Sequence, residues 1–499
     1  MNAPLRRVGV VVLVLFGLLF ANLNWVQAVR GEHYRTSPYN GRVQVEEYER
    51  QRGVVEADGK GLAVSKATSG ELKYLRSYPF GPAYAHVVGY KPVNLGATGV
   101  ERYENEFLAG TADRFVIDRL RDQFRREKTG GGHVLLTISR RAQETAYREL
   151  SENRVGAKKG AVVALDPATG AVQAMVSLPS FNPNPLASHD TEEAAAAYRR
   201  LEQNPAGPLR NRAVGEIFPP GSTFKVVVAA AALENGHTPD TAIPAGPTYT
   251  PPQTTRAMGN AHPSICPESR VTLKEALTES CNTGFARLGV KLGPETLKAK
   301  ARDFGFGDEE LTCGELGGGG VPVAASKTGG MLRPDGQPDP PVVAQSSIGQ
   351  NDVAMTPMQG ALIAAAVAND GVQMHPYVVK SLLDPGRRPV ETAAPRQLRR
   401  SVSADVARQL REMMVSVVQR GTGTNAQIEG AEVGGKTGTA EGGDNDKDQG
   451  WFIGFVLKDG KPISAVAVLL EQAGAGGSAE ATRIAGRVMR AVLRDRVGG

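Results

Sequence analysis

Apolar positions are concentrated first at the N-terminus, where an almost unbroken hydrophobic run covers residues 8–21 and continues, with a few polar interruptions, to Ala28. As a helix, residues 8–28 are about long enough to cross a hydrocarbon layer of roughly 30 Å. Arg6 and Arg7 stand just before the run, which predicts that residues 1–7 stay on the cytoplasmic side. The pattern therefore predicts one membrane anchor followed by an extracytoplasmic body.

A cleaved secretory signal is the alternative interpretation of this segment. Its strictly apolar part is short, and Val26-Gln27-Ala28 resembles a small-x-small cleavage site. Both interpretations export the rest of the chain, so the expected compartment does not depend on the choice. No other segment is apolar enough to span a membrane.

Residues 30–155 mix short β-like runs with polar, Gly and Pro positions and show no catalytic constellation. The pattern changes at Gly160, where the apolar runs 161–165 and 172–176 flank a Pro/Gly turn. Two such runs around a turn predict a β-hairpin and the start of a new domain. We therefore predict a non-catalytic domain over residues 30–155 and a second domain over residues 160–499.

Two Pro- and Gly-rich segments, residues 238–266 and 314–342, predict long loops of the kind that often wall a cleft. Residues 450–457 and 464–470 predict strands. A closing amphipathic helix is predicted by apolar residues at helical spacing: Ile484, Val488, Ala491 and Val492. The order of strands, many helices, strands and a helix indicates a mixed α/β (α+β) domain with helices on the faces of a sheet.

The length of 499 residues indicates two or three domains rather than one core. The net charge is only +6, because 52 acidic residues nearly balance 58 basic ones. The densest basic stretch, residues 114–128, contains Asp118 and Asp122 between its arginines, so a solvated helix face explains it better than a nucleic-acid patch. We predict no nucleic-acid partner.

The three cysteines, Cys266, Cys281 and Cys313, form no C-x-x-C pair, and the seven histidines form no H-E-x-x-H. The sequence therefore predicts neither a metal site nor a cofactor. An exported chain could form one disulfide and keep one thiol, but the spacing does not assign the pair.

Ser222 and Lys225 follow the rigid turn Pro219-Pro220-Gly221 and precede a segment that is apolar on every side. This arrangement predicts a serine at the N-terminus of a buried helix, with a lysine one turn along on the same face. A desolvated lysine loses its proton easily and can serve as the base for the hydroxyl. In isolation, S-x-x-K is more simply explained as a helix cap followed by a lysine.

A capping box at Thr272 and Glu275 predicts a helix that runs toward Ser280 and Asn282, where a hydroxyl and an amide can reach one pocket. S-x-N alone has no diagnostic value, because it also occurs at residues 151–153 and 180–182.

The tripeptide K-T-G occurs three times, beginning at Lys128, Lys327 and Lys436. Only the last precedes a polar turn, residues 441–449, and then the strand-like residues 451–455. It alone is predicted to occupy an edge strand beside a cleft, with a cation and two hydroxyls facing a substrate carboxylate.

Together, Ser222-x-x-Lys225, Ser280-x-Asn282 and the K-T-G at Lys436 match, in order, the three motifs of penicillin-binding proteins and serine β-lactamases. The chain is identified by resemblance as a class B penicillin-binding protein, most similar to its actinobacterial members. Further segments support the likeness: residues 99–103, 211–213, 348–350, 356–357, 368–371 and 421–424.

The resemblance implies a D,D-transpeptidase with a β-lactamase-like antiparallel sheet flanked by helices, and a dimerisation-like N-terminal domain. Ser222 would attack the stem-peptide carbonyl, Lys225 would act as base, and Ser280 would relay a proton to the leaving D-alanine. The remaining site residues would bind substrate: Asn282 the acyl side chain, and Lys436, Thr437, Gly438 and Thr439 the terminal carboxylate, with the Ser222 and Thr439 amides as oxyanion hole.

The resemblance also implies partners: stem peptides and their lipid-linked precursor, β-lactam antibiotics that acylate the serine, and a membrane glycosyltransferase that would polymerise the glycan. The protein would then sit in the cell membrane with its catalytic domain outside. The sequence leaves open whether it serves division or elongation.

Three rival functions remain to be weighed. Residues 430–437 literally match the nucleotide-binding pattern G-x-x-x-x-G-K-[ST], but no apolar strand precedes them and no helix is predicted after them. A β-lactamase needs neither an anchor nor an N-terminal domain, and no acidic residue suggests itself for deacylation. A catalytically silent β-lactam sensor or wall-binding scaffold is the third alternative.

Overall fold

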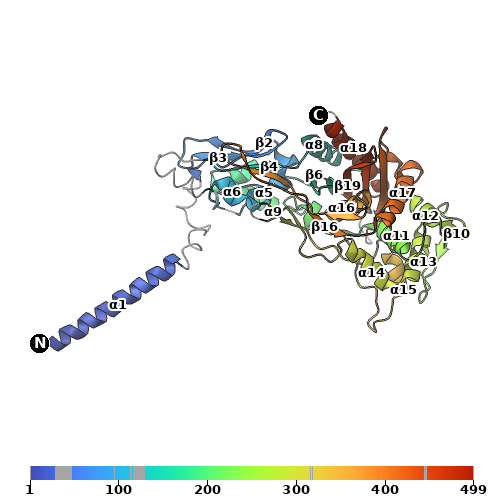
Figure 1. Cartoon of the computed structure of the whole chain (residues 1–499), viewed down its shortest axis with the longest axis horizontal. Helices are drawn as coiled ribbons and strands as arrows, with labels where there is room; N and C mark the ends of the chain where they lie inside the picture. The colour runs from blue at the N-terminus through green and yellow to red at the C-terminus, as the bar shows by residue number, and fades with distance from the viewer. Residues whose placement is uncertain are drawn as a thin grey trace.

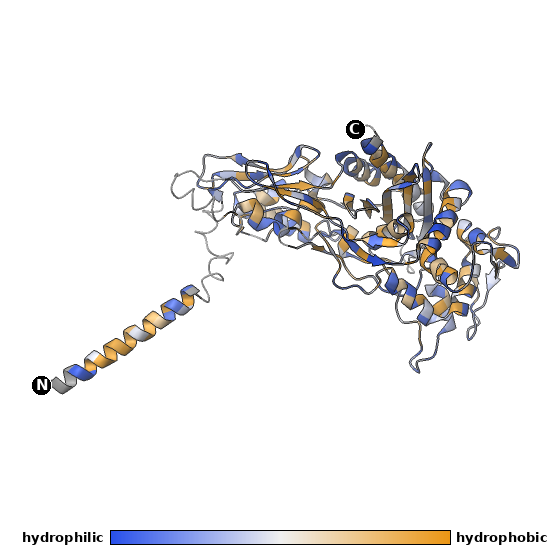
Figure 2. Ribbon diagram, in the orientation of Figure 1, coloured by the Kyte–Doolittle hydropathy of each residue, from blue (hydrophilic) through white to orange (hydrophobic). Residues whose placement is uncertain are grey.

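The computed structural model describes residues 2–28, 48–94, 96–112, 115, 130–314, 316, 319–442 and 447–497. The predicted apolar segment forms one helix, α1 (Asn2–Ala28), of which Arg6–Gln27 has a mean hydropathy of 2.2 and contains no buried residue. Figure 2 shows the apolar colour along most of this helix. An exposed apolar helix of this length is compatible with a membrane anchor.

A six-stranded sheet joins the N-terminal part of the chain to a hairpin from much later in the sequence. Its order is β15-β14-β4-β1-β2-β3, with β4 parallel to β1 and antiparallel to β14. Its strands are β1 (Val55–Ala57), β2 (Lys60–Ala67), β3 (Tyr74–Ser77), β4 (His133–Leu136), β14 (Val379–Leu383) and β15 (Pro389–Thr392). Four short helices accompany it: η1 (Gly81–Ala83), α4 (Ala85–Val88), α5 (Gly99–Tyr103) and α6 (Asn105–Ala109).

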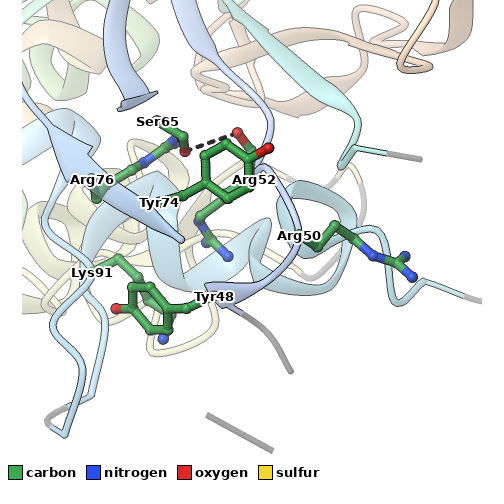
Figure 3. Close-up of a pocket in the computed structure, with 7 residues that line it drawn as sticks. All are labelled: Tyr48, Arg50, Arg52, Ser65, Tyr74, Arg76 and Lys91. Atoms are coloured by element: carbon green, nitrogen blue, oxygen red, sulfur yellow. Dashed lines mark hydrogen bonds between the residues drawn. The ribbon is translucent and has the colours of Figure 1, made fainter. Parts of the chain in front are cut away.

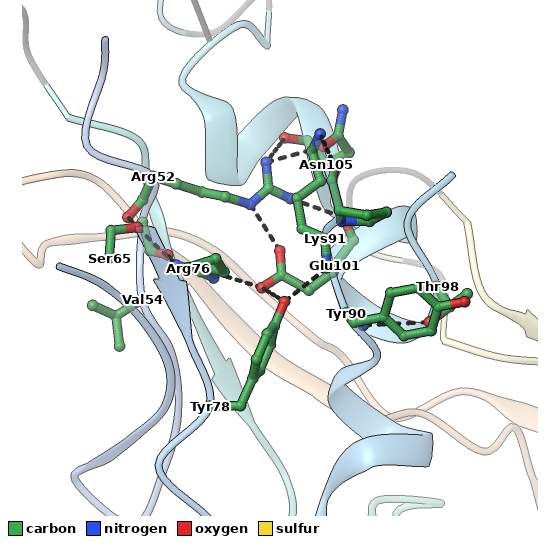
Figure 4. A network of polar contacts seen from close by, with 12 residues as sticks. Arg52, Val54, Ser65, Arg76, Tyr78, Tyr90, Lys91, Thr98, Glu101 and Asn105 are labelled. Carbon is green, nitrogen blue, oxygen red and sulfur yellow. Dashed lines mark hydrogen bonds and ion pairs between the residues drawn. The ribbon is translucent and has the colours of Figure 1, made fainter. Parts of the chain in front are cut away.

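A buried carboxylate fastens this N-terminal part together (Figure 4). Glu101, on α5, accepts hydrogen bonds from Arg52 Nε at 2.7 Å and from Arg76 Nε, on β3, at 2.6 Å. Burial alone would raise the pKa of Glu101, but the charges of Arg76 and Arg52 outweigh it and lower the pKa. The carboxylate therefore stays ionised and ties α5 to β3 and to the segment before β1.

The second sheet is five-stranded and entirely antiparallel, in the order β17-β18-β19-β5-β6. The hairpin predicted from residue 160 is confirmed as β5 (Lys159–Leu165) and β6 (Val172–Leu178). The two predicted C-terminal strands are confirmed as β18 (Gln449–Lys458) and β19 (Lys461–Glu471). One edge is formed by β17 (Glu432–Ala440), which carries the third motif.

Helices cover both faces of this sheet (Figure 1). Along β5, Val162 and Ala164 join the hydrophobic cluster that contains the buried positions of α18, whereas Ala161 and Val163 join the cluster on the opposite face. The first face is covered by α8 (Arg140–Ser151) and α18 (Gly477–Val497), and the second mainly by α16 (Pro357–Ala368). The predicted amphipathic helix is confirmed, since its four apolar positions are all buried in α18.

The remaining elements lie outside the two large sheets. The longer helices are α9 (Thr191–Glu202), α11 (Lys225–Glu234), α12 (Leu273–Thr278), α13 (Asn282–Leu292), α14 (Pro294–Asp303), α15 (Pro340–Ser346) and α17 (Ala404–Arg420). The short ones are η3 (Asn184–Ala187), α10 (Arg212–Gly215), η4 (Gly221–Phe224) and η5 (Thr424–Ala426). Further strands are β7 (Ala242–Pro244), β8 (Thr248–Tyr249), β9 (Met258–Gly259), β10 (Arg270–Thr272), β11 (Thr312–Cys313), β12 (Val321–Pro322), β13 (Val372–Met374) and β16 (Gln397–Arg400).

The predicted long loops are confirmed where the structure describes them. Residues 238–266 hold only strands of two or three residues, and residues 314–342 hold little more than β12 and the start of α15. The predicted charged helix over residues 114–128 lies, apart from Phe115, outside the described residues.

Candidate active site

The first motif lies where a short 3-10 turn passes into a buried helix. Ser222 lies within η4, and Lys225 is the first residue of α11, so the serine lies one turn ahead of the α-helix rather than at its first position. Every residue of α11 from Lys225 to Leu233 is buried, as the apolar sequence predicts. The side chain of Lys225 is fully buried, whereas Ser222 remains partly exposed.

The amine of Lys225, in the first motif, forms hydrogen bonds with the second motif. Lys225 Nζ donates to Asn282 Oδ1 at 2.7 Å, to the Ser280 carbonyl oxygen at 2.8 Å and to Ser280 Oγ at 3.3 Å. Burial lowers the pKa of this amine to about 7. A large share of Lys225 is therefore neutral near pH 7 and able to accept a proton. Within the described residues no hydrogen bond joins it to Ser222, a contact that often forms only when substrate binds.

Ser280 occupies an unusual backbone conformation between two helices. It has a φ of 62°, in the left-handed region, while α12 ends before it and α13 begins after it at Asn282. The predicted cap of α12 is confirmed in part: Thr272 Oγ1 accepts from the amide of Glu275 at 3.1 Å, but the Glu275 carboxylate pairs with Arg420 instead of the Thr272 amide. Backbone strain of this kind is common where a side chain must be aimed into a site.

The third motif lies on the edge strand β17, as predicted. Lys436 is fully buried, and its Nζ donates to the Thr437 carbonyl oxygen at 3.1 Å. Burial, and then repulsion by the charge of Lys225, lowers the pKa of Lys436 well below its usual value. Thr437 Oγ1 is 2.6 Å from Thr422 Oγ1.

Two glycines allow the serine turn to lie directly against this strand. A Cβ on Gly221 would lie 2.3 Å from the Thr439 carbonyl oxygen, and one on Gly438 would lie 2.7 Å from the Pro220 carbonyl oxygen. Trp451 Nε1, on β18, donates to the Pro219 carbonyl oxygen at 2.9 Å. The three motifs, which begin at residues 222, 280 and 436, therefore lie together in the fold.

Among the described residues, no hydrogen bond joins the rival K-T-G at Lys327 to this site. Lys327 is exposed and takes part only in an isolated bridge to Ala354, and Lys128 lies outside the described residues. Residues 432–440 form an extended strand, so the sequence that matches a nucleotide-binding loop does not form one.

All three cysteines are buried free thiols. The Cys266 and Cys281 side chains lie close enough for each to change the pKa of the other, whereas burial alone raises the pKa of Cys313 to about 12. Among the residues that the structure describes, no group of three His, Cys, Asp or Glu side chains could hold a metal ion.

Two residues of the site carry no signal that the motif analysis could use. Thr422 lies in the segment 421–424, which resembled the family but received no role, and its hydroxyl bonds that of Thr437. Asn260 lies in a predicted loop and hydrogen-bonds the backbone of Asn282. Neither belongs to a motif with fixed spacing.

A separate pocket in the N-terminal part does not offer the same chemistry. Figure 3 shows its lining residues: Tyr48, Arg50, Arg52, Ser65, Tyr74, Arg76 and Lys91. The hydroxyl of Ser65 donates to the Arg52 carbonyl oxygen at 3.0 Å and accepts from Arg76 Nη1 at 3.2 Å. A serine held by a guanidinium has no base beside it.

Comparison with known proteins gives consistent matches. Residues 160–490 match the "Penicillin binding protein transpeptidase domain" and residues 52–134 the "Penicillin binding protein A dimerisation domain". The "Peptidoglycan D,D-transpeptidase PbpA" of Mycolicibacterium smegmatis is 41% identical over 99% of this chain and all of its own length. That of Mycobacterium tuberculosis is 40% identical over the whole of both chains.

Solved structures agree with the sequence comparison. The crystal structure of M. tuberculosis PBPA is 40% identical, with a TM-score of 0.83 over 89% of this chain and all of that chain. The ceftriaxone acyl-enzyme complex of the same protein has a TM-score of 0.83 over 90% of this chain.

Proposed function

We propose, from the premise that this chain belongs to the class B penicillin-binding proteins, that Ser222 is the nucleophile of its acyl-transfer reaction. The chain is a peptidoglycan D,D-transpeptidase that acts in cell-wall synthesis and is acylated by β-lactams. The observation that carries the proposal is the buried Lys225 amine, 3.3 Å from Ser280 Oγ, beside the turn η4, in which Gly221 lies directly against Thr439.

In the acylation step, the Ser222 hydroxyl attacks the penultimate D-alanyl carbonyl and gives its proton to the neutral Lys225 amine. The negative charge that develops on the carbonyl oxygen is stabilised by the backbone amides of Ser222 and Thr439. Ser280, within reach of Lys225, passes the proton to the leaving nitrogen as the bond to the terminal D-alanine breaks. The acyl group then passes to an amine of a neighbouring strand and Ser222 is released.

Substrate binding is assigned to the other motif residues. Asn282 binds the amide of the acyl side chain, and Lys436, Thr437 and Thr439, on the edge strand β17, bind the terminal carboxylate. Gly438 contributes by its lack of a side chain, which lets the serine turn approach the strand. A carboxylate beside Lys436 would restore the charged form that burial disfavours. A penicillin carries an amide, a strained carbonyl and a carboxylate in the same order.

Labelling with a fluorescent penicillin tests the assignment. We expect covalent label on the wild-type ectodomain and none on Ser222→Ala, with weak labelling of Lys436→Ala because carboxylate binding is lost. Ser188→Ala, a serine near α9, is the control and should label as the wild type does. Equal labelling of wild type and Ser222→Ala would overturn the assignment.

The rate at which label is lost separates the transpeptidase from its rivals. A transpeptidase hydrolyses its penicilloyl-enzyme far more slowly than a β-lactamase does, so its label persists. It also joins a donor stem peptide to an amine acceptor. A silent sensor or scaffold would take the label but join no peptides.

The location and the polymerase partner belong to the same proposal. α1 anchors the protein in the cell membrane with residues 1–7 in the cytoplasm and the catalytic domain outside, and a separate membrane glycosyltransferase supplies the glycan strands. The exposed apolar surface of α1 that follows Arg7 supports the anchor. Recovery of the full chain in washed membranes, with the N-terminal residues still present by mass spectrometry, would distinguish the anchor from a cleaved signal.

A further inference from the structure

Helix α13, which begins at Asn282 of the second motif, is capped by a residue from a distant loop. Its own N-cap position, Cys281, provides no side-chain acceptor. Instead, Asn260 Oδ1 accepts from the amide of Asn282 at 2.8 Å and from the amide of Thr283 at 3.1 Å. The first amides of a helix have no partner within the helix, so Asn260 satisfies two that would otherwise be unpaired.

The capping side chain is itself held on its other side. Asn260 Nδ2 donates to the Ile265 carbonyl oxygen at 2.7 Å and to the Gly246 carbonyl oxygen at 3.2 Å. Thr283 Oγ1 donates to the same Gly246 oxygen at 2.7 Å. One amide group therefore uses both of its donor hydrogens and its acceptor to fasten the loop 238–266 to the start of α13.

The hydrogen bonds of Asn260 hold Asn282, the residue that contacts the amine of Lys225. Asn282 Oδ1 accepts from Lys225 Nζ at 2.7 Å, and Asn282 Nδ2 donates to the carbonyl oxygen of Gly259 at 3.3 Å. Gly259 is the neighbour of Asn260, so the loop fixes both the backbone of Asn282 and the direction in which its side-chain amide points.

We propose that Asn260 is a positioning residue that holds Asn282 in register with Lys225 and thereby sets the preference for substrates with an amide in the acyl side chain. The inference rests on the proposed function, in which Asn282 binds that amide. Asn260 touches neither Ser222 nor Lys225 in the hydrogen bonds of the described residues, so its effect passes through Asn282.

The test compares acylation by two β-lactams, penicillin G, which has an acylamino side chain, and imipenem, which has a hydroxyethyl group instead. For Asn260→Ala we expect the second-order rate of acylation by penicillin G to fall about tenfold or more, the equivalent of one lost hydrogen bond, and that by imipenem to change less than about threefold. The ratio of the two rates is the readout, because a general loss of stability would lower both rates alike.

A second variant, Asn260→Asp, tests the inference even if Asn260→Ala does not fold. Asn260→Asp keeps the acceptor oxygen but turns a second oxygen toward the Ile265 and Gly246 carbonyls, which loosens the loop. We expect the same change in ratio, about threefold or more. Asn153→Ala is the matched control, since Asn153 also accepts from Ala157 N at 2.8 Å and donates to two carbonyl oxygens, but it lies just after α8 and its hydrogen bonds among the described residues reach no motif residue.

The outcomes separate the inference from the proposed function. An unchanged ratio in folded Asn260 variants, with the wild type acylated on Ser222, overturns the inference alone. Acylation of Ser222→Ala by penicillin G, mapped to another residue, overturns the proposed function. A change in ratio for Asn153→Ala equal to that for Asn260→Ala also overturns the inference, because the effect would then not depend on Asn282.

Discussion

At the scale of single residues, burial changes what two lysines can do. Lys225 and Lys436 are both fully buried among the described residues, and burial lowers the pKa of each. For Lys225 the value of about 7 makes the neutral amine available at neutral pH. An exposed lysine, with a pKa near 10.4, would be protonated and inert as a base under the same conditions.

This difference predicts the pH dependence of acylation. The second-order rate of acylation by penicillin G should rise with pH and level off above about 7, because only the neutral Lys225 amine accepts the serine proton. Rates measured from pH 5.5 to 8.5 by stopped flow provide the check, and Lys225→Arg should be inactive throughout, since arginine stays protonated. A rate that does not vary over this range would contradict the role of Lys225.

Ser280 combines a chemical role with a strained backbone, and two substitutions separate them. Ser280→Gly and Ser280→Ala both remove the hydroxyl, so each should slow acylation by about 100-fold or more. Only glycine adopts the left-handed φ of 62° without strain. The free energy of unfolding of the glycine variant should therefore be about 1 kcal/mol higher than that of the alanine variant. Urea unfolding measures the difference; an alanine variant more stable than the glycine variant would refute the strain.

How much of the site the sequence predicts depends on whether a residue has a local signature. Ser222, Lys225 and Lys436 stand in spaced motifs, and the strand-like residues 451–455 that follow Lys436 distinguished it from Lys327. Asn260 has no such pattern, because two of its partners, Gly246 and Asn282, lie 14 residues before it and 22 residues after it and only the folded loop brings them together.

At the scale of elements, the site depends on how closely the turn η4 approaches the strand β17. Gly221 has a φ of 52°, and a Cβ there would lie 2.3 Å from the Thr439 carbonyl oxygen, a backbone atom that cannot move aside without the strand. The distance between the nucleophile and the substrate-binding edge is therefore fixed by the absence of one methyl group.

Gly221→Ala should accordingly cost both stability and activity. We expect a loss of about 2–4 kcal/mol, from the left-handed backbone and the clash together, and acylation slowed by about 100-fold as η4 moves. Gly460→Ala is the matched control, because Gly460 has a φ of 74° but nothing within 4 Å of its Cβ. The control should lose about 1–2 kcal/mol and keep its acylation rate. Equal acylation by the two variants would show that the close approach is not needed.

Elements with a strong local period were predictable from sequence, and those defined by distant pairing were not. The hairpin β5-β6 was predicted by two apolar runs around a turn, and the helix α18 by apolar positions at helical spacing. The strand β14 gave no such signal, because its partner β4 lies more than 240 residues earlier and its register is set only in the fold.

At the scale of the whole molecule, that distant pairing joins the two parts of the chain. Strand β14, from the C-terminal part, pairs with β4, and helix α8 packs on α18 and β6. Leu150 of α8 is fully buried in the cluster that contains Ile484 and Val488 of α18. Although residues 160–490 match a transpeptidase domain, part of the packing around that domain comes from residues before 160.

A fragment that starts at the predicted domain boundary should therefore be unstable. Residues 160–499 lack β4, so the edge of β14 is left unpaired, and lack α8, so the apolar face of α18 is exposed. We expect residues 48–499 to acylate with penicillin as the full chain does, and residues 160–499 to aggregate or melt at least about 10 °C lower.

An intermediate fragment distinguishes the two causes. Residues 137–499 keep α8 but not β4, so recovery of most of the lost stability would assign the defect to the exposed face of α18, and no recovery would assign it to the unpaired β14. Differential scanning fluorimetry and penicillin labelling of the three fragments provide the measurements. If residues 160–499 melted and acylated like residues 48–499, the N-terminal part would be an independent unit, and the shared sheet would contribute nothing to the catalytic domain.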